Sequence, residues 1–229
     1  LPFSVVGAVK FPDQGQIDPL KLMARMAGQL RIYERTGGRE ISKEGALTED
    51  GFKIEADQYI VATHFPLWNR HGMYFMKMYQ QRSYCIALDG APEVGGMYVD
   101  EAGGGISFRD AGKFLLLGGG GHRTGKEGGC WHQLRQFAGR FYPKAREICN
   151  WAAQDCMTLD GIPYIGRYAK SLPNVRVATG FNKWGMTSAM TAAQILTDQV
   201  TGKKNPFGEG FEPCRRMKKG RLLRNGMEA

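Results

Sequence analysis

From about residue 80 to residue 117, apolar positions come in short runs that polar and glycine positions interrupt. Four short runs rich in apolar residues lie close together there, and glycine turns separate them. Such close spacing leaves no room for crossover helices, so the pattern predicts an antiparallel meander. The predicted strands are residues 83–88, 96–99, 105–109 and 113–117.

The flanking segments show helical spacing instead. Asp18 suits an N-cap and Pro19 the first helical position, and apolar residues then recur every three or four positions up to Leu30. A second apolar stripe runs from Met186 to Val200. The other expected elements are a helix at 129–141 and strands at 4–11, 51–55 and 58–62, the last one apolar enough for a buried strand of a parallel sheet. Together these patterns predict an α/β fold of mixed, partly α+β, character in two domains.

The net charge of +9 does not indicate a nucleic-acid partner. Six of the basic residues lie in the last 16 residues, against Glu228 alone, which leaves only +4 for the rest of the chain. No aromatic residues are interleaved with this basic run, as single-strand binding would require. Residues 214–229 are therefore expected to be a basic tail or linker.

Composition favours a protein of the cytoplasm. No apolar run approaches the roughly 20 residues of a membrane helix, so no membrane partner is expected. The five cysteines are dispersed, without a C-x-x-C pair or a Cys/His pair at metal-ligand spacing. This predicts reduced thiols and no metal site.

The segment from Gly120 to Lys126 satisfies G-x-x-x-x-G-K. However, Glu127 stands where a phosphate loop needs Ser or Thr to hold Mg²⁺, and its carboxylate would repel phosphates. A P-loop-like nucleotide binder is thus only an alternative. The glycines at 118–121 fit better as a strand-to-helix turn close to a ligand, and His122 is then either an active-site residue or a hydrogen-bonded loop histidine.

The most informative stretch lies between Asp160 and Thr187. A turn at 160–166 is followed by a short buried strand, a glycine-flanked loop and a helix start. Backbone N–H groups and the positive end of the helix dipole meet at such a start. The site suits an anion, or the electron-rich edge of a ring that gains negative charge on reduction.

These residues and their spacing resemble the D-amino-acid-oxidase-like family of FAD-dependent oxidoreductases. The resemblance covers about 5–213 and includes the turn at 15–19, the strand end Val61-Ala62-Thr63 and the segments 151–155 and 158–166, although His64 stands where glycine is common. It implies a partial FAD-binding domain at 13–66 and 156–213, and an antiparallel substrate domain at 1–12 and 67–155.

The resemblance also implies site residues. Arg109 is expected to pair with a substrate carboxylate, unless it is a surface arginine paired with Asp110 or Glu101. His122 is the other expected catalytic residue. Asp160 has a second interpretation as a turn cap. The expected cofactor contacts are Asp160, Gly161, Pro163, Thr179, Gly180, Lys183, Trp184, Gly185, Met186 and Thr187.

No G-x-G-x-x-G occurs in the 229 residues, so the pyrophosphate of FAD has no phosphate loop. The expected partner is therefore a missing N-terminal FAD-binding segment, and the chain alone should bind FAD weakly or not at all and be inactive. Relatives with this pattern often continue into a Rieske domain, but its Cys/His ligand pairs are absent here. The prediction is a portion of an FAD-dependent enzyme that oxidises an amine or amino acid by hydride transfer. The alternative is a non-catalytic binding module that keeps the fold without FAD.

Overall fold

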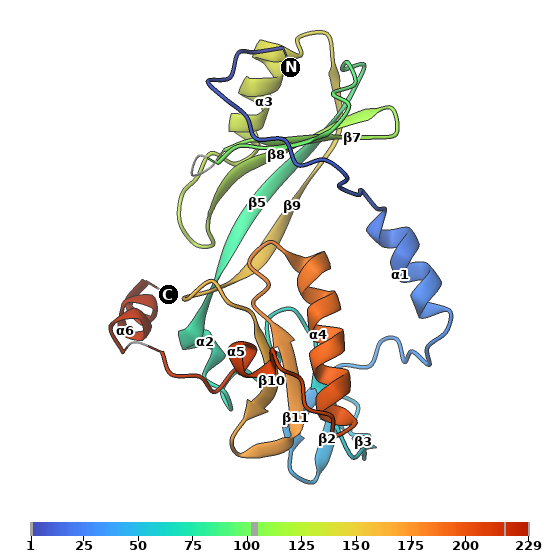
Figure 1. Cartoon of the computed structure of the whole chain (residues 1–229), viewed down its shortest axis with the longest axis vertical. Coiled ribbons are helices and arrows are strands. Elements are labelled where there is room, and N and C mark those ends of the chain that lie inside the picture. Colours follow the sequence, from blue (N-terminus) through green and yellow to red (C-terminus); the bar gives the residue numbers. More distant parts are fainter. Residues whose placement is uncertain (1, 102–104, 218, 229) are drawn as a thin grey trace.

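The computed structural model describes residues 2–101, 105–217 and 219–228. Its strands form three sheets, with the order β6-β7-β8-β5-β9 in the largest, β10-β11-β4 in the second and β1-β2-β3 in the third. Figure 1 shows the largest sheet at one end of the molecule. Two of its strands, β5 and β9, are long and extend toward the other two sheets. The fold therefore mixes an antiparallel part with an α/β part, as the sequence predicts.

The largest sheet is antiparallel throughout, as predicted, but only β6, β7 and β8 follow one another as a meander, because β5 pairs with β8 and β9. Its helix α3 packs on one face, where Leu134 and Ala138 meet Tyr84, Ile86 and Leu117 in a buried apolar core. The elements are β5 (Met78–Asp89), β6 (Met97–Val99), β7 (Ser107–Ala111), β8 (Phe114–Arg123), α3 (Cys130–Phe141) and β9 (Arg146–Thr158).

The second sheet joins β4 and β11 in parallel and β10 and β11 antiparallel. Helix α4 covers it through Ala192, Ile195 and Leu196. The parallel pairing of β4 is as predicted, but its burial is not: Val61 is buried while Ile60 is 52% exposed, because β4 is an edge strand among the described residues. The bounds are β4 (Tyr59–Val61), β10 (Tyr164–Ala169), β11 (Leu172–Thr179), α4 (Gly185–Val200) and α5 (Gly208–Phe211).

A small third sheet and two helices were only partly foreseen. The prediction at 51–55 corresponds to a strand of two residues, whereas the hairpin before it was not predicted. Helix α1 begins at Pro19 as expected, and Oδ1 of Asp18 accepts the N–H groups of Leu20 and Lys21. The bounds are α1 (Pro19–Ala27), β1 (Gly38–Ser42), β2 (Gly45–Thr48), β3 (Lys53–Ile54) and α2 (Tyr74–Lys77).

The predicted strand at 4–11 is wrong. The segment has no strand partner and is irregular, with Val6, Val9 and Phe11 exposed. Only the preceding Phe3 is packed, with its ring centroid 5.4 Å from that of Phe137 and 5.0 Å from that of Phe141. An apolar β-branched run forms a strand only where an edge is available to pair with it.

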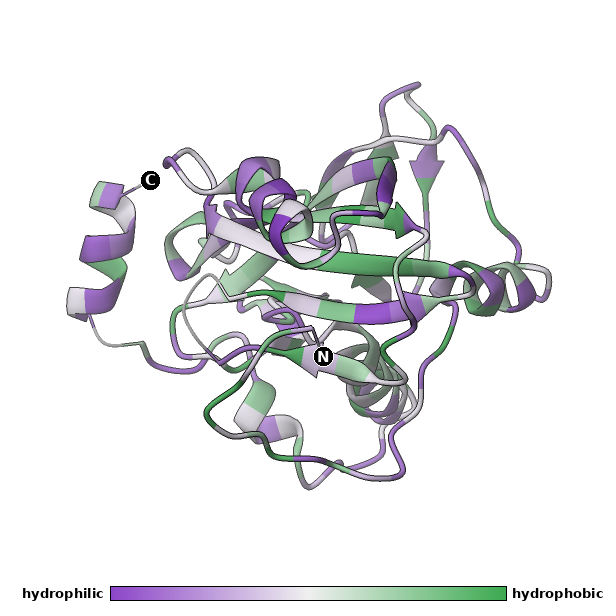
Figure 2. Ribbon diagram, turned by 90° about the horizontal axis from the view of Figure 1, so that it is seen from above, coloured by the Kyte–Doolittle hydropathy of each residue, from purple (hydrophilic) through white to green (hydrophobic). Residues whose placement is uncertain are grey.

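The C-terminal segment, expected as a basic tail or linker, contains the helix α6 (Lys219–Glu228). Lys218 and Ala229 lie outside the described residues. Asn225 of α6 is buried and donates hydrogen bonds to the carbonyl oxygens of Met76 and Met78, both 3.0 Å away. The rest of α6 is mostly hydrophilic, as its ribbon shows beside the C-terminal mark in Figure 2. The helix is therefore docked on the protein through a buried amide, and Glu228 adds an ion pair with Arg123 over 2.8 Å.

No helix in the described part of the chain has the length and apolar character needed to cross a bilayer.

Candidate functional site

The loop between β11 and α4 has an unusual backbone. Asn182 and Lys183 both have positive φ, at 49° and 70°, which is uncommon for residues with side chains. The Asn182 side chain fixes this conformation: its Oδ1 accepts the N–H of Thr158 over 2.8 Å, and its Nδ2 donates to the Gly180 carbonyl over 2.8 Å. The loop is thereby held against the end of β9.

Helix α4 begins at the end of this loop without a side-chain cap. Trp184 occupies the N-cap position and makes no side-chain capping bond, and the first turn has no acidic residue. The first helical residues, Gly185, Met186 and Thr187, are exposed. Their backbone N–H groups can therefore meet an external acceptor, and the flavin ring edge as that acceptor stays a prediction.

Thr179 and Gly180 end β11 on the buried side of the loop. The Thr179 hydroxyl donates to the carbonyl of His64, and a Cβ on Gly180 would lie 2.4 Å from the Thr158 methyl. Gly180 also has a φ of 71°, so only glycine fits here. His64, where the resemblance expects glycine, has the same left-handed conformation, with φ at 63°.

Asp160 is engaged by the C-terminal segment. Its two carboxylate oxygens accept hydrogen bonds from Nε and a terminal nitrogen of Arg215, each over 2.8 Å. Its Oδ1 also accepts the N–H of Ile162, which is the turn cap considered above. Gly161 supplies the positive φ of this turn, and the Pro163 carbonyl accepts from Arg215 as well. Asp160 thus fixes the turn, and no contact from its carboxylate to a cofactor is needed to explain it.

The face of the largest sheet opposite α3 looks toward the loop before α4. We call it the inner face and define it by Ser83, Cys85, Ser107 and Arg109, which alternate along β5 and β7 with the core residues of the other face. Nζ of Lys183 lies 2.5 Å from Oγ of Ser83 and 2.7 Å from Oδ2 of Asp155 on β9. The loop and the sheet are therefore directly joined.

The pKa of the Cys85 thiol is affected by charges on the inner face. Burial raises the pKa of this thiol, while the positive charges of Arg109 and Lys183 oppose that rise. Both cations therefore lie close enough to act on one thiol. The inner face combines a thiol, hydroxyl groups and two cations, one of which Asp155 neutralises.

Arg109 lines a hollow of about 490 Å³ between β7 and the start of α1. Gln16 closes one side by donating from Nε2 to the Asp110 carbonyl over 2.9 Å. The Asp110 carboxylate turns away and accepts the N–H groups of Val94 and Gly95. Among the described residues Arg109 makes no ion pair, so the expected alternative, pairing with Asp110 or Glu101, is not seen.

His122 lies on the other face of the sheet from Arg109. In β8, Leu115 and Leu117 point toward α3, so simple alternation would put residue 122 on the inner face. A β-bulge intervenes: Arg82 pairs with His122 but Tyr84 pairs with Gly119, so two glycines oppose Ser83 alone. The bulge turns His122 toward α3, where its Nε2 lies 2.9 Å from the Tyr84 hydroxyl. The two expected catalytic residues therefore lie on opposite faces of the sheet.

The same strand corrects the interpretation of the glycine run. Residues 118–121 lie within β8 and do not form a strand-to-helix turn, since β8 extends to Arg123. The G-x-x-x-x-G-K segment is therefore half strand, and no loop wraps around a phosphate-sized space before α3. This removes the structural basis for the P-loop-like alternative.

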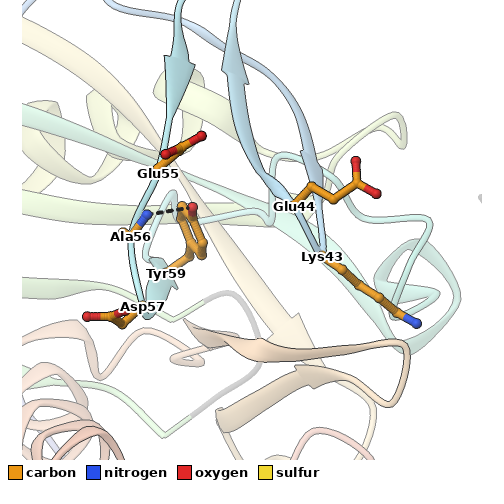
Figure 3. Close-up of a pocket in the computed structure, with 6 residues that line it drawn as sticks. All are labelled: Lys43, Glu44, Glu55, Ala56, Asp57 and Tyr59. Atoms are coloured by element: carbon orange, nitrogen blue, oxygen red, sulfur yellow. Dashed lines mark hydrogen bonds between the residues drawn. The ribbon is translucent and has the colours of Figure 1, made fainter.

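A second hollow of about 430 Å³ lies at the third sheet, away from the loop and the inner face. Figure 3 shows Glu44 on the hairpin side and Glu55 and Asp57 on the segment between β3 and β4, with the Ala56 N–H donating to the Tyr59 hydroxyl over 2.9 Å. Three carboxylates make this hollow unsuited to an anionic substrate or to a phosphate. The described residues contain no cluster of three or more His, Cys, Asp or Glu side chains that could hold a metal ion.

Comparison with known proteins identifies the family. Residues 1–199 match the FAD-dependent oxidoreductase (DAO) family, and the chain belongs to it. Among curated proteins, a putative Rieske 2Fe-2S iron-sulfur protein, YhfW, of Bacillus subtilis (strain 168) is 32% identical over 231 residues. That match covers 94% of this chain and 45% of the relative.

Solved structures share the fold. Glycine oxidase from Geobacillus kaustophilus superposes with a TM-score of 0.69 at 19% identity, over 82% of this chain and 54% of that one. An L-amino acid deaminase from Proteus vulgaris gives 0.62 at 23% identity, over 85% and 54%. The chain thus spans about half the length of the proteins that it matches.

Sequence reasoning missed three residues of this site. Ser83 and Asp155 are ordinary polar residues of strands, and Arg215 belongs to the segment expected as a tail. Strand alternation could have indicated Ser83, since positions 83 and 85 share a face in any regular strand, but Asp155 is placed by the pairing of β9 with β5. Nothing local indicates that Arg215 reaches Asp160, 55 residues away.

Proposed function

We propose that this chain is the substrate-binding part and a portion of the FAD-binding part of an oxidoreductase that oxidises an amine or amino acid. The proposed division places 13–66 and 156–213 in the FAD-binding part and 1–12 and 67–155 in the substrate part. The segment 214–229 joins the two, because Arg215 holds Asp160 and Asn225 holds the start of β5.

The observation that carries this proposal is the bridge made by Lys183. It sits two residues before the uncapped start of α4 and bonds to Ser83 and Asp155 on the sheet. The backbone donors of α4 and the polar inner face therefore border one region. A flat, reducible ring held by the start of α4 and a substrate held by the inner face would meet there.

The residues at the start of α4 fit the flavin ring. No side chain competes for the N–H groups of the first turn, and no carboxylate lies in that turn to repel a negative charge. When bound, FAD would accept the hydride, and negative character would then develop at the pyrimidine edge of its ring. The helix start is preorganised to stabilise this charge.

Arg109 is the proposed anchor for a substrate carboxylate. Its guanidinium makes no ion pair among the described residues and lines a hollow open to the inner side of β7. Guanidinium geometry suits two parallel hydrogen bonds to a carboxylate. The hydroxyl groups of Ser83 and Ser107 offer neutral contacts along the same face. Substrate would thus be oriented by one charged anchor and a polar wall.

The pyrophosphate of FAD requires a partner segment. A separate dinucleotide-binding segment that adds a parallel strand to the free edge of β4 would supply it. Two features support this: β4 has no neighbour on that edge among the described residues, and no residue of α1 is buried. Leu20 and Met23 of α1 are 77% and 63% exposed, which is unusual for an amphipathic helix without a partner. In Figure 1, α1 lies at one side of the molecule.

Titration with FAD tests the proposal. The isolated chain should bind FAD no better than the micromolar range, because the ring contacts alone must offset several kcal/mol of lost translational freedom. The full-length protein should purify with flavin absorbance bands. Sub-micromolar binding by the chain would show that another segment grips the phosphates. A full-length protein without flavin would support the non-catalytic binding module instead.

A further inference from the structure

Three reactive side chains gather beside the first turn of α3, on the face of the sheet away from the proposed substrate region. The Sγ of Cys130 lies 3.8 Å from Nε2 of His122, and the Tyr84 hydroxyl lies 2.9 Å from the same nitrogen. The Tyr84 and His122 rings are stacked, with an interplanar angle of 21°. We call these residues the Cys130 cluster. The proposed oxidation of an amine uses none of them.

The glycine-rich stretch of the sequence builds this cluster. The bulge at Gly120 and Gly121 turns His122 toward α3. Gly120 then approaches the first residue of α3 so closely that a Cβ on it would lie 2.4 Å from the Cys130 carbonyl oxygen. A Cβ on Gly128 would likewise lie 2.3 Å from the His122 ring. Glycine at these positions is what lets the imidazole and the thiol meet.

The hydrogen bonds also determine which nitrogen of His122 can act as a base. Nδ1 lies 2.9 Å from the Arg123 carbonyl oxygen, which can only accept, so Nδ1 carries the proton. Nε2 consequently holds the only free lone pair of the ring, and the Tyr84 hydroxyl at 2.9 Å and the Cys130 sulfur at 3.8 Å are the two groups that can donate to it. A nucleophile, a base and a group that orients the base are therefore arranged in sequence.

The location of Cys130 suits a negatively charged sulfur. Cys130 is the first residue of α3, a helix of 12 residues, where the backbone dipole stabilises negative charge. Its backbone is left-handed, with φ at 51°, which few residues with a side chain adopt. The thiol is half-buried, so small reagents can reach it. The described residues offer no metal-binding cluster that would explain the pair otherwise.

We propose that Cys130 is a peroxide-reactive thiol and that His122 is its general base. In the reaction, Nε2 of His122 takes the thiol proton, and the thiolate sulfur attacks one oxygen of hydrogen peroxide. The S–O bond forms as the O–O bond breaks, and the departing hydroxide takes the proton back from His122. The products are a sulfenic acid on Cys130 and one water molecule. The sulfur is oxidised by two electrons and the peroxide is reduced by two.

The chain provides its own controls for the test. Cys149 is exposed but has no histidine contact, and Cys156 is buried with a pKa raised to about 12, first by burial. The purified chain is treated with substoichiometric hydrogen peroxide and a sulfenic-acid trapping reagent, and each cysteine is quantified by mass spectrometry. We expect Cys130 to be trapped at least about ten times faster than Cys149, since general bases typically contribute a hundredfold or more. Equal or faster trapping of Cys149 would overturn the proposal.

Two substitutions test the role of the histidine. His122→Gln keeps a polar side chain but removes the base, so the rate at Cys130 should fall to that at Cys149. His132→Gln, at an exposed histidine of α3 outside the cluster, should leave the rate within about threefold, because that imidazole is not the base. Labelling of Cys156 reports unfolding in either variant. An unchanged Cys130 rate in a folded His122→Gln protein contradicts the proposal. If that variant does not fold, the comparison of Cys130 with Cys149 in the unmodified chain decides.

Discussion

Lys183 joins the loop before α4 to the largest sheet, since its ammonium nitrogen lies 2.7 Å from Oδ2 of Asp155 on β9. The side chains of Lys183 and Asp155 are 39% and 27% exposed, so this ion pair is only partly buried. A pair of this kind stabilises a fold little. Its consequence is positional, because it decides how close the uncapped start of α4 lies to the inner face.

Replacing Lys183 by Met should therefore separate stability from cofactor binding. We expect the free energy of unfolding to change by at most about 1 kcal/mol. In the full-length protein, the affinity for FAD should fall by about tenfold, because the loop is no longer tied to the sheet. Chemical denaturation and flavin fluorescence measure the two effects. Lys113→Met is the matched control, since Lys113 pairs with Asp89 over 3.4 Å far from the loop and should alter neither quantity.

Arg109 should govern affinity for the substrate carboxylate. Hydrogen bonds to a charged group contribute about 1.5–3 kcal/mol, so Arg109→Leu should raise the KM of the full-length enzyme by roughly 10- to 150-fold with a smaller effect on kcat. Arg109→Lys should recover part of the loss, because it restores the charge without the planar fork. Steady-state kinetics on a carboxylate-bearing amine and on its methyl ester provide the measurement. An equal loss on both substrates would argue against a carboxylate contact.

The short apolar runs between glycine turns made the antiparallel sheet predictable, although not the pairing of β5 with β8, and the strand–loop–helix pattern indicated the start of α4. The position of His122 was not predictable, because four glycines carry no side chains to show where alternation skips a residue. The strand at 4–11 failed for a different reason: its composition suits a strand, but it has no edge to pair with. Arg215 was missed because charge counting treats a basic run as uniform, whereas one of its members is tied to Asp160 and Pro163.

The pair of Arg215 and Asp160 should contribute measurably to stability. The side chains of Arg215 and Asp160 are only 15% and 19% exposed. The guanidinium carbon of Arg215 also lies 4.1 Å from the centroid of the Tyr164 ring. Arg215→Met leaves a mostly buried carboxylate without its partner and should cost about 2–3 kcal/mol of unfolding free energy. Arg224→Met removes a pair that is 80% exposed at Arg224 and should change stability by less than about 0.5 kcal/mol. Urea denaturation of both variants makes the comparison.

The contribution of this pair should depend on pH in a defined direction. Burial raises the pKa of Asp160, but the hydrogen bonds from Arg215 and from the Ile162 N–H lower it by more than burial raises it. The pKa of this carboxyl therefore lies below its ordinary value. A carboxyl whose pKa is lower when folded than when unfolded stabilises the fold above its unfolded pKa of about 3.9 and loses that contribution as pH falls. The stability difference between the unmodified chain and Arg215→Met should thus be constant near neutrality and shrink below about pH 4. A gap that widens on acidification would contradict this assignment.

Asn225 should determine whether α6 stays docked. It is 3% exposed, donates to the carbonyl oxygens of Met76 and Met78, and accepts from Arg123 through Oδ1 over 2.9 Å. Asn225→Leu removes these bonds and leaves two buried carbonyl groups without donors, which should cost about 2–3 kcal/mol. Because only α6 loses its anchor, trypsin should cleave first within 219–228, well before the rest of the chain. Leu223→Ala, at a position 63% exposed, should leave the cleavage rate unchanged. Uniform digestion of Asn225→Leu would instead mean that α6 is integral to the core, and its loss would then lower the stability of the whole fold.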